Sequence, residues 1–295
     1  MFSSINKIID NHLSQASLDK FSVIIGDNPS KGARSPILWN KVYKAENKNV
    51  AMLPLDVRSE RLGELISCLN ENNKCLGGAI AVPHKEAMFN LLKDKCAPEV
   101  KKIGAINCFF RATKGHSSLF SGTNTDGEGS LDPISKLIKE QKNLNVCLLG
   151  YGGAGKAVAA FLIKNMEESQ KLKIFNRTEI KESLTNSELS FFSAKVLGDH
   201  IENFDLIINA TTVGSKQSLN ESPIPYELFS KIKPNTIIYD INYDPPQTTL
   251  MKIAEKTGLK TINGLRMNLI QAVLAYKYTN DTSLSNNEIY EIMNS

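Results

Sequence analysis

The chain has 295 residues, of which 41% are apolar and 22% charged, as in globular proteins long enough for one large or two moderate domains. Its net charge of +4, from 35 basic and 31 acidic residues, is small and scattered, which argues against nucleic-acid binding but suits an anionic small ligand. No apolar run approaches the length of a membrane span, and the first twenty residues lack the apolar segment of a signal peptide. We therefore expect a small-molecule partner and no membrane or nucleic-acid partner.

The number of cysteines is odd and no pair has C-x-x-C spacing, so neither a disulfide framework nor a zinc site is indicated. The five are Cys68, Cys75, Cys96, Cys108 and Cys147. Free thiols indicate a reducing compartment, and we expect the cytoplasm. The four histidines are scattered, so we expect no metal site.

The first half of the chain alternates short β-rich runs with amphipathic helical segments. The predicted strands cover 21–26, 49–55, 76–82 and 105–111. Helical segments such as 35–48 and 59–73 lie between them. This β-α-β-α order predicts a mostly parallel sheet covered by helices.

A stretch rich in turn residues, 113–130, follows and marks a domain boundary. A second alternating series comes next, with predicted strands at 145–150, 171–176, 194–198, 205–211 and 236–243. The last long helical segment, 265–280, follows "TING" and is expected to return to the first domain. We predict an α/β fold of two α/β domains, the first covering 1–126 with 264–295 packed onto it, and the second 127–263.

The most informative segment is "NVCLLGYGGAGKA", a glycine-rich loop between a buried strand and an Ala- and Leu-rich helix. Gly150, Gly152 and Gly155 match G-x-G-x-x-G, and Gly153 and Ala154 complete the loop. Such glycines allow a tight turn and bring the backbone close to a pyrophosphate at the helix N-terminus. The alternative is a glycine-rich turn in some other α/β protein, but the strand before and the helix after favour a Rossmann-like dinucleotide domain.

The end of the next strand decides between NAD and NADP. An NAD site usually has an acid there for the ribose 2′-hydroxyl, whereas "FNRTEIK" has none at the tip. Arg177 could pair with a 2′-phosphate and Lys181 could add a second cation, which favours NADP. The alternative is that Arg177 is a solvated loop residue, and Glu179 is a contrary sign.

A nicotinamide cofactor implies hydride transfer, and oxidising an alcohol also requires removing its proton. Lys85, in "AIAVPHKEAMF", lies where a strand passes into a helix, although the helix dipole disfavours a cation in the first turn. That edge of a parallel sheet is where ligands bind, so Lys85 is a candidate acid/base. Asp126, in "TNTDGEG", is a second candidate. The alternatives are a surface lysine and an aspartate that caps a helix or forms a turn.

Two further polar residues lie in the first half. Asn107, in "GAINCFF", is an amide within an apolar strand, where it needs a hydrogen-bond partner that could be merely structural. Ser35, followed by Pro36, can also be interpreted as the cap and first residue of a helix. Neither residue alone indicates a reaction.

In their order along the chain, these motifs resemble the shikimate dehydrogenase family, including its quinate-using relatives. The resemblance runs over almost the whole chain, from about Phe21 to the C-terminal helices. It is carried by "GDNPSKGARSPILWN", "AIAVPHKEAMF", "GAINCF", "TNTDGEG", "GYGGAGKA", "NRT", "INATTVG", "YDINYDPPQTTL" and "NGLRMNLIQA".

The resemblance implies roles for individual residues. It implies that Lys85 is the general acid/base and Asp126 its partner. The implied substrate contacts are Ser35, Asn107, Tyr243 and Gln271. The implied NADP contacts beyond the glycine loop are Asn176, Arg177, Thr178, Lys181, Ala210, Thr211, Ile241, Gly264 and Met267.

Four positions depart from the family pattern, and three of them lie in the implied substrate motifs. Ala33, Ala79 and Ala81 stand where polar residues are usual, and Arg266 stands where a small residue is common. Each alanine removes a hydrogen-bonding group, at a typical cost of ~1–3 kcal/mol toward a polar ligand. The chemistry residues therefore persist while part of the recognition set is absent.

Our first hypothesis is an NADP-dependent shikimate dehydrogenase, monomeric or homodimeric, that reversibly reduces 3-dehydroshikimate to shikimate. A second hypothesis keeps the reaction but changes the substrate to quinate or another cyclic hydroxy acid, with fewer hydroxyls or an amino group. A third is a non-catalytic NADP-binding regulator, against which the retention of both Lys85 and Asp126 argues.

Overall fold

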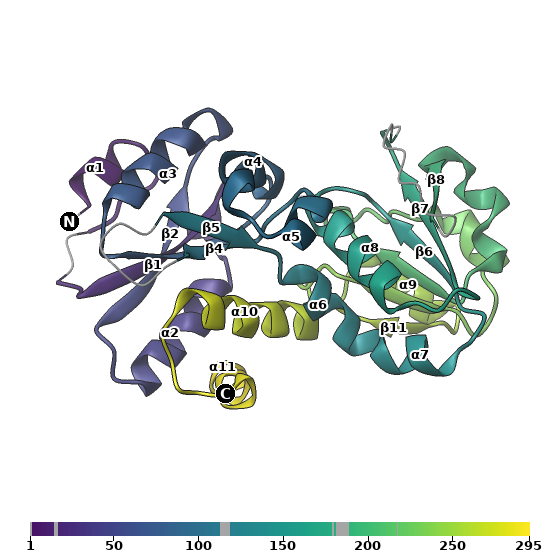
Figure 1. Cartoon of the computed structure of the whole chain (residues 1–295). Helices are drawn as coiled ribbons and strands as arrows, with labels where there is room; N and C mark the ends of the chain where they lie inside the picture. Colours follow the sequence, from purple (N-terminus) through teal and green to yellow (C-terminus); the bar gives the residue numbers. More distant parts are fainter. Residues whose placement is uncertain (1, 15–16, 113–118, 179, 181–188, 217) are drawn as a thin grey trace. The chain divides into compact units, whose positions relative to one another are not determined.

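The computed structural model describes residues 2–14, 17–112, 119–178, 180, 189–216 and 218–295. The chain forms two compact units (Figure 1). Unit 1 comprises Met1–Thr125 with Leu269–Ser295, and unit 2 comprises Asp126–Asn268. Among the described residues no helix combines the length and apolar character needed to cross a bilayer.

Unit 1 is built on a five-stranded sheet in the order β2-β1-β3-β4-β5. Its strands are β1 (Lys20–Gly26), β2 (Val50–Asp56), β3 (Cys75–Ile80), β4 (Cys108–Arg111) and β5 (Phe120–Thr123). β1 pairs in parallel with β2 and β3, whereas β4 is antiparallel to both β3 and β5. The sheet is therefore mixed, with only β4 reversed. The inner strand β1 is buried on both faces, which explains its nearly continuous apolar sequence.

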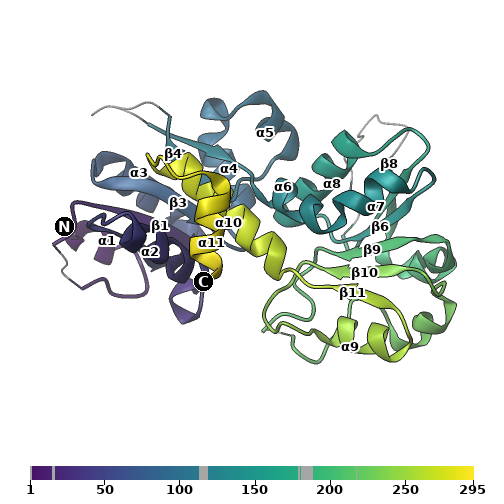
Figure 2. The same ribbon diagram turned by 90° about the horizontal axis from the view of Figure 1, so that it is seen from below.

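Helices cover both faces of this sheet (Figure 1). They are α1 (Ser3–Asn6), α2 (Ser35–Ala45), α3 (Leu62–Glu71), α4 (Lys85–Leu92), α5 (Pro98–Ile103), α10 (Leu265–Thr279) and α11 (Asn286–Asn294). Residues of α1, α3 and α4 share one apolar core, and residues of α2, α10 and α11 share the other. α10 begins in unit 2 and belongs to unit 1 from Leu269 onward, and α11 lies in unit 1 as well (Figure 2).

Unit 2 holds a six-stranded sheet in the order β11-β10-β9-β6-β7-β8. Its strands are β6 (Asn145–Leu149), β7 (Lys171–Asn176), β8 (Leu189–Ser193), β9 (Leu206–Asn209), β10 (Ile237–Asp240) and β11 (Lys260–Ile262). All neighbouring strands are parallel. This is the strand order of the doubly wound dinucleotide-binding fold, with its reversal point between β6 and β9.

The faces of this second sheet are also covered by helices. They are α6 (Asp126–Leu131), α7 (Ser135–Glu140), α8 (Gly153–Asn165), α9 (Thr249–Lys256) and several short 3₁₀ turns. α7 and α8 pack on one face, and α9 packs on the other with the 3₁₀ turns that lie between Ala194 and Lys231. The predicted fold class is confirmed.

Three details differ from the predicted elements. The strand expected at 194–198 is wrong, because Ala194–Asp199 forms a 3₁₀ helix whose start is capped by the Ser193 side chain. The strand of this region is β8, which ends at Ser193, immediately before the 3₁₀ helix. β5 and β11 were not predicted, because each is short and carries little alternation. β5 is stabilised by a contact that its own sequence does not reveal. The Phe120 ring packs edge-on against the Phe109 ring, with 4.9 Å between the ring centroids.

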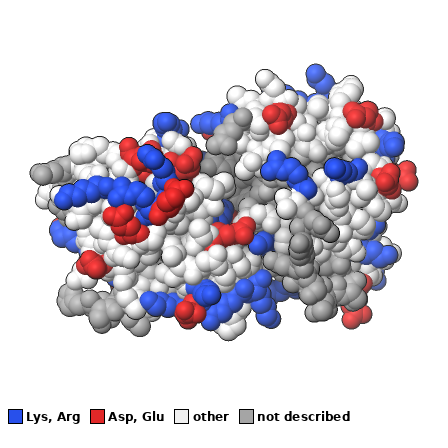
Figure 3. Space-filling model, turned by 90° about the horizontal axis from the view of Figure 1, so that it is seen from above, with Lys and Arg blue, Asp and Glu red and all other residues white. Residues whose placement is uncertain are grey.

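The surface carries charges of both signs. On the face in Figure 3, basic and acidic side chains are interspersed, and neither sign forms a continuous sheet of charge over either unit. This agrees with the small net charge of +4. The described residues of this face give no indication of a broad polyanion-binding surface.

A carboxylate ties α2 to the segment after α10 within unit 1. The Glu46 carboxylate accepts hydrogen bonds from the Tyr276 hydroxyl at 2.5 Å and the Thr282 hydroxyl at 2.6 Å. It also forms an ion pair with Lys48 at 3.0 Å. Partial burial acts to raise the pKa of Glu46, but the hydrogen bonds from these three side chains outweigh it and lower the pKa. Glu46 therefore stabilises the fold above the ordinary glutamate pKa, and this contribution is lost as the pH falls through the lowered value.

We predict that Glu46→Gln lowers the free energy of unfolding of unit 1 by about 1 kcal/mol at pH 7, because one charge-assisted acceptor is lost. The difference from the wild type should shrink as the pH is lowered from 5 to 3. Urea titrations followed by fluorescence of Trp39, the single tryptophan, measure it. Glu71→Gln, an exposed change in the same unit, is the control. A difference that does not change with pH would contradict the assigned role.

Candidate active site

Ser35 is the first residue of α2 and is 7% exposed. The alternative that it caps this helix is wrong, because Arg34 occupies the cap with helical torsions and no side chain caps the end. Within the described part of the chain, the Ser35 hydroxyl makes no hydrogen bond. A nearly buried hydroxyl without a protein partner is available to a ligand.

Lys85 is the first residue of α4, which follows the carboxyl end of β3, and its side chain is half-buried. Its carbonyl oxygen accepts a hydrogen bond of 3.0 Å from the backbone N–H of Ile106. Ile106 precedes Asn107, whose own carbonyl accepts from the N–H of Ile80 at 2.7 Å. The start of α4 is thus hydrogen-bonded to the segment that carries Asn107.

Asn107 is 2% exposed and uses both ends of its amide. Its Nδ2 donates to the Thr125 hydroxyl at 2.9 Å and to the side-chain oxygen of Gln271 at 3.2 Å. Its Oδ1 accepts from the backbone N–H of Thr125 at 2.8 Å. The Thr125 hydroxyl also contacts the Gln271 carbonyl at 3.0 Å. The structure thus brings together two predicted substrate residues, Asn107 and Gln271, that lie 164 positions apart.

Thr125 is the member of this network that the sequence argument missed. It is 2% exposed and ends unit 1. The run of small polar residues in "TNTDG" was attributed to turn chemistry, and only its aspartate was singled out. Asp126, the next residue, is 5% exposed and begins α6.

In unit 2 the glycine loop joins β6 to α8, as predicted. Gly150 has a positive φ of 94° and donates its N–H to the Phe175 carbonyl at 2.8 Å. A Cβ on Gly155 would lie 2.2 Å from the Gly150 carbonyl oxygen, so the strand and the helix meet there through bare backbone. Gly152 is the N-cap, and a Cβ on it would meet nothing within 4 Å among the described residues. Gly153 and Ala154 begin α8, whose N-terminus no described side chain caps.

The end of β7 lies beside this loop. The Asn176 side chain accepts from the backbone N–H of Tyr151 at 3.1 Å and donates to the Thr178 carbonyl at 2.8 Å. Arg177 and Thr178 are exposed. The predicted second cation, Lys181, and the contrary residue Glu179 lie outside the described residues.

The next two strands end against the same loop. A Cβ on Gly150 would lie 2.7 Å from the Thr211 side chain and 3.2 Å from the Ala210 carbonyl carbon, which places the end of β9 beside the end of β6. Ile241 follows β10, and a Cβ on Gly264 would lie 1.9 Å from its carbonyl oxygen. Ala210, Thr211, Ile241 and Gly264 therefore gather at the carboxyl edge of the sheet with the glycine loop.

Asp240, at the end of β10, holds these loops together. Its carboxylate accepts from Asn209 and Asn242 side chains, both at 3.0 Å, and from the Thr248 hydroxyl at 2.7 Å. Burial raises the pKa of Asp240, although these hydrogen bonds oppose the increase. No sequence motif pointed to Asp240 as a site residue. Asn209 and Asp240 are polar residues within the apolar strands "DLIINAT" and "TIIYDINY", and this pattern could have indicated the role of Asp240.

The remaining residues of the expected set lie in unit 2. Met267 is buried in α10, and Tyr243 is half-buried after β10. Arg266 pairs with Asp132, which gives the unusual arginine a partner within its own unit. Among the described residues no group of three or more His, Cys, Asp or Glu could hold a metal ion.

The three unexpected alanines share one side of the sheet in unit 1. Ala79 belongs to the apolar core between the sheet and α2, and Ala33 and Ala81 pack against that core. Ser35 starts the helix on this side. The substitutions therefore make one face near Ser35 apolar.

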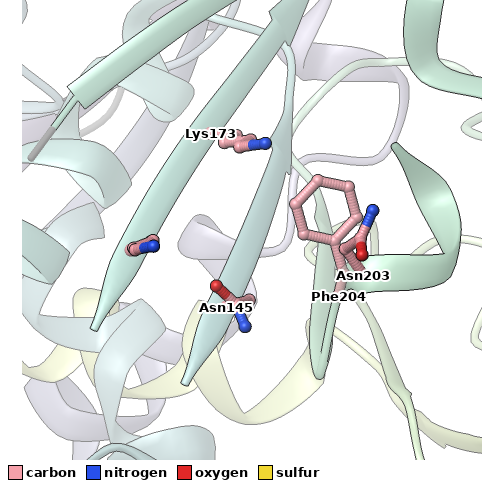
Figure 4. Close-up of a pocket in the computed structure, with 5 residues that line it drawn as sticks. Asn145, Lys173, Asn203 and Phe204 are labelled. Carbon is pink, nitrogen blue, oxygen red and sulfur yellow. The ribbon is translucent and has the colours of Figure 1, made fainter. Parts of the chain in front are cut away.

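Two surface cavities lie elsewhere. One, of about 240 Å³, is lined by Asn145, Lys171, Lys173, Asn203 and Phe204, at the edge where β6 and β7 begin (Figure 4). The glycine loop is at the opposite edge. The other is lined by residues of α1 and α3 and the turn that follows α3. Neither contains a residue of the predicted site.

Comparison with known proteins gives one consistent result. The model of the shikimate dehydrogenase substrate binding domain matches residues 24–109. A shikimate dehydrogenase (NADP(+)) of Methanococcus aeolicus is 30% identical over 280 residues, which cover 90% of this chain and 95% of that protein. The chain belongs to the shikimate dehydrogenase family.

Solved members of the shikimate dehydrogenase family share the architecture. The crystal structure of the Aquifex aeolicus enzyme matches with a TM-score of 0.77 at 27% identity, covering 96% of this chain and 100% of that one. A shikimate dehydrogenase solved in complex with NADP⁺ matches with a TM-score of 0.77 at 28% identity. The match covers 93% of this chain and 94% of that one.

We predict that Asn107→Ala destabilises unit 1 of this family member by roughly 2–3 kcal/mol, because the buried N–H of Thr125 loses its acceptor. Gln271→Ala should cost less, because the Asn107 Nδ2 that loses this acceptor still donates to the Thr125 hydroxyl at 2.9 Å. Urea unfolding followed by Trp39 fluorescence compares the two variants. Equal small losses in both would show that the amide network is not central to the unit.

Proposed function

We propose that this protein is an NADP-dependent shikimate dehydrogenase that reversibly reduces 3-dehydroshikimate to shikimate. The observation that carries the proposal is the hydrogen bond between the Asn107 and Gln271 side chains, beside a backbone hydrogen bond that ties Lys85 to Ile106, the neighbour of Asn107. It occurs in a chain 30% identical to a shikimate dehydrogenase (NADP(+)) over almost its whole length. We assign substrate binding to unit 1 and NADP binding to unit 2.

The residues of unit 2 fit NADP. The space at Gly152 and the uncapped start of α8 suit a pyrophosphate, which helix N-termini favour. Arg177 is an exposed cation directly after β7, and no described residue at that tip is acidic, which suits a 2′-phosphate. When bound, NADPH supplies the hydride and NADP⁺ accepts it.

The chain's own residues handle the proton and the orientation. In the reduction direction, the Lys85 ammonium gives a proton to the ketone oxygen as hydride reaches the same carbon. In the oxidation direction, the neutral amine takes that proton back. We assign Asp126 to orient the hydroxyl and the lysine, Ser35 and Tyr243 to hold the carboxylate, and Asn107 and Gln271 to contact the ring hydroxyls.

The experiment that tests this function is reduction of NADP⁺ by the purified protein with saturating shikimate, followed by NADPH absorbance. Steady turnover, with a KM below about 1 mM, is the expected result. Protein that binds NADP⁺ but does not turn over shikimate would contradict the proposed substrate.

A second candidate function is the same reaction on another cyclic hydroxy acid. The observation that favours it is the apolar face formed by Ala33, Ala79 and Ala81 near Ser35. An apolar surface binds a ring with fewer hydroxyls better than a fully hydroxylated one, since a buried hydroxyl needs a partner. A panel of ring acids, including quinate and deoxy or amino analogues, ranked by kcat/KM, separates the two candidates.

We also propose that the protein works in the reducing cytoplasm, as a monomer or homodimer. All five cysteines are free thiols, and four of them are buried.

We predict that Lys85→Ala lowers turnover by at least 10²-fold while the Kd for NADP⁺ changes less than twofold, because the proton donor is lost and unit 2 is untouched. Stopped-flow rates measure turnover, and calorimetric titration with NADP⁺ measures the Kd. Lys93→Ala, which removes an exposed lysine just after α4, is the control. A parallel loss of activity and cofactor binding would contradict this assignment.

We predict that Gly152→Ala folds normally but weakens NADP⁺ binding by one to two orders of magnitude, roughly 1.4–2.8 kcal/mol. The methyl group meets no described atom, and the extended torsions at Gly152 suit alanine, so it enters only the space proposed for the pyrophosphate. Calorimetric titration and thermal melting check the two parts. Unchanged affinity would show that the cofactor does not approach this loop.

A further inference from the structure

Asp56, at the carboxyl end of β2, binds a loop that follows the neighbouring strand. Its side chain is nearly buried, with 5% of the residue exposed. One carboxylate oxygen accepts the backbone N–H of Ser30 at 2.8 Å, and the other accepts the Ser30 hydroxyl in a short hydrogen bond. Among the described residues these are the partners of the carboxylate, so its hydrogen bonds are directed at one residue.

The bound residue lies at the centre of the loop that leads to Ser35. The loop begins after Gly26, the β1 residue that pairs with Asp56 in the sheet. Ser30 lies in a single 3₁₀ turn, Pro29–Lys31, and Gly32 follows with a φ of 122°. The loop's own backbone hydrogen bonds are few and local, such as Ala33 N–H to Pro29 at 3.0 Å. A loop of this kind needs an external anchor to hold one conformation.

Asp56 is itself fixed from the other side. Its backbone N–H donates to the side-chain oxygen of Asn11 at 2.8 Å, and its carbonyl accepts the N–H of Asp10 at 2.7 Å. The Asn11 side chain also donates to the Pro54 carbonyl at 3.0 Å. The N-terminal segment therefore supports the end of β2, and the carboxylate reaches the loop from a rigid base.

We propose that Asp56 is a positioning residue that holds the loop 27–34 in the conformation that presents Ala33 and Ser35 to the substrate. This inference rests on the proposed function, in which Ser35 binds the carboxylate of the ring acid. Asp56 does not touch the substrate. Its charge-assisted hydrogen bonds order the loop in the free protein. The loss of loop conformational entropy therefore occurs on folding and does not weaken substrate binding.

The test measures steady-state kinetics of the full-length wild type, Asp56→Ala, Asp56→Asn and Ser30→Ala. We expect Asp56→Ala to raise the KM for the ring acid about tenfold, with kcat and the KM for NADP⁺ changed less than twofold. Asp56→Asn keeps one acceptor and should fall between the wild type and Asp56→Ala. Ser30→Ala added to Asp56→Ala should have no further effect, because both act through one contact.

Asn6→Ala is the matched control, because the Asn6 side chain bonds the backbone carbonyl and N–H of Leu13, both at 2.9 Å, and makes no hydrogen bond with Asp56 or with the loop 27–34. It should lower the melting temperature and leave the KM nearly unchanged. An equal rise in KM for both variants, or no rise for Asp56→Ala, overturns the proposal. If Asp56→Ala does not fold, Asp56→Asn and Ser30→Ala decide, and a normal KM in both overturns it.

The failure of this inference is distinguishable from the failure of the proposed function. A wild-type protein that does not turn over or bind the ring acid overturns the function, and the inference with it. A wild-type protein that turns over, with variants of unchanged KM, overturns the inference alone.

Discussion

The buried amide of Asn107 is the constraint on which the candidate site in unit 1 depends. An amide enclosed by protein must satisfy both its donors and its acceptor. Here it does so with Thr125 and with Gln271, 164 positions away in the sequence. The same segment binds the backbone of Lys85 through Ile106. One short stretch therefore fixes the start of α4, the end of unit 1 and one face of α10.

Unit 2 depends on a different constraint, which is close approach of backbone to backbone. A side chain at Gly155 would meet the Gly150 carbonyl oxygen, and one at Gly264 would meet that of Ile241. Glycine at these positions lets the strands and helices converge at the carboxyl edge of the sheet. Gly152 differs, since a side chain there would meet no described atom. Steric need explains the first two glycines, and we propose that a bound cofactor accounts for the third.

Much of the fold follows from the sequence because its signals are local. The alternation of strands and helices, and the strand, glycine loop and helix around Gly150, are all legible within about twenty residues. The errors have two sources. β5 is stabilised by its pairing with β4 and by the packing of Phe120 on Phe109, which are tertiary contacts. Residues 194–198 form a 3₁₀ helix whose start the Ser193 side chain caps, and an apolar strand pattern does not reveal such a cap. The partners of Asn107, and the anchoring of Ser30 by Asp56, join distant segments that no local pattern connects. The roles of individual site residues remain predictions.

The central claim is that hydride passes directly between the carbinol carbon of a ring acid and the nicotinamide while Lys85 carries the proton. The most direct measurement uses shikimate with deuterium on the reacting carbon, NADP⁺ and the wild-type protein, with mass spectrometry of the nucleotide. The account predicts NADPH that is heavier by one mass unit and a slower rate than with unlabelled shikimate. Unlabelled NADPH, or no NADPH from protein that binds both ligands, would contradict it.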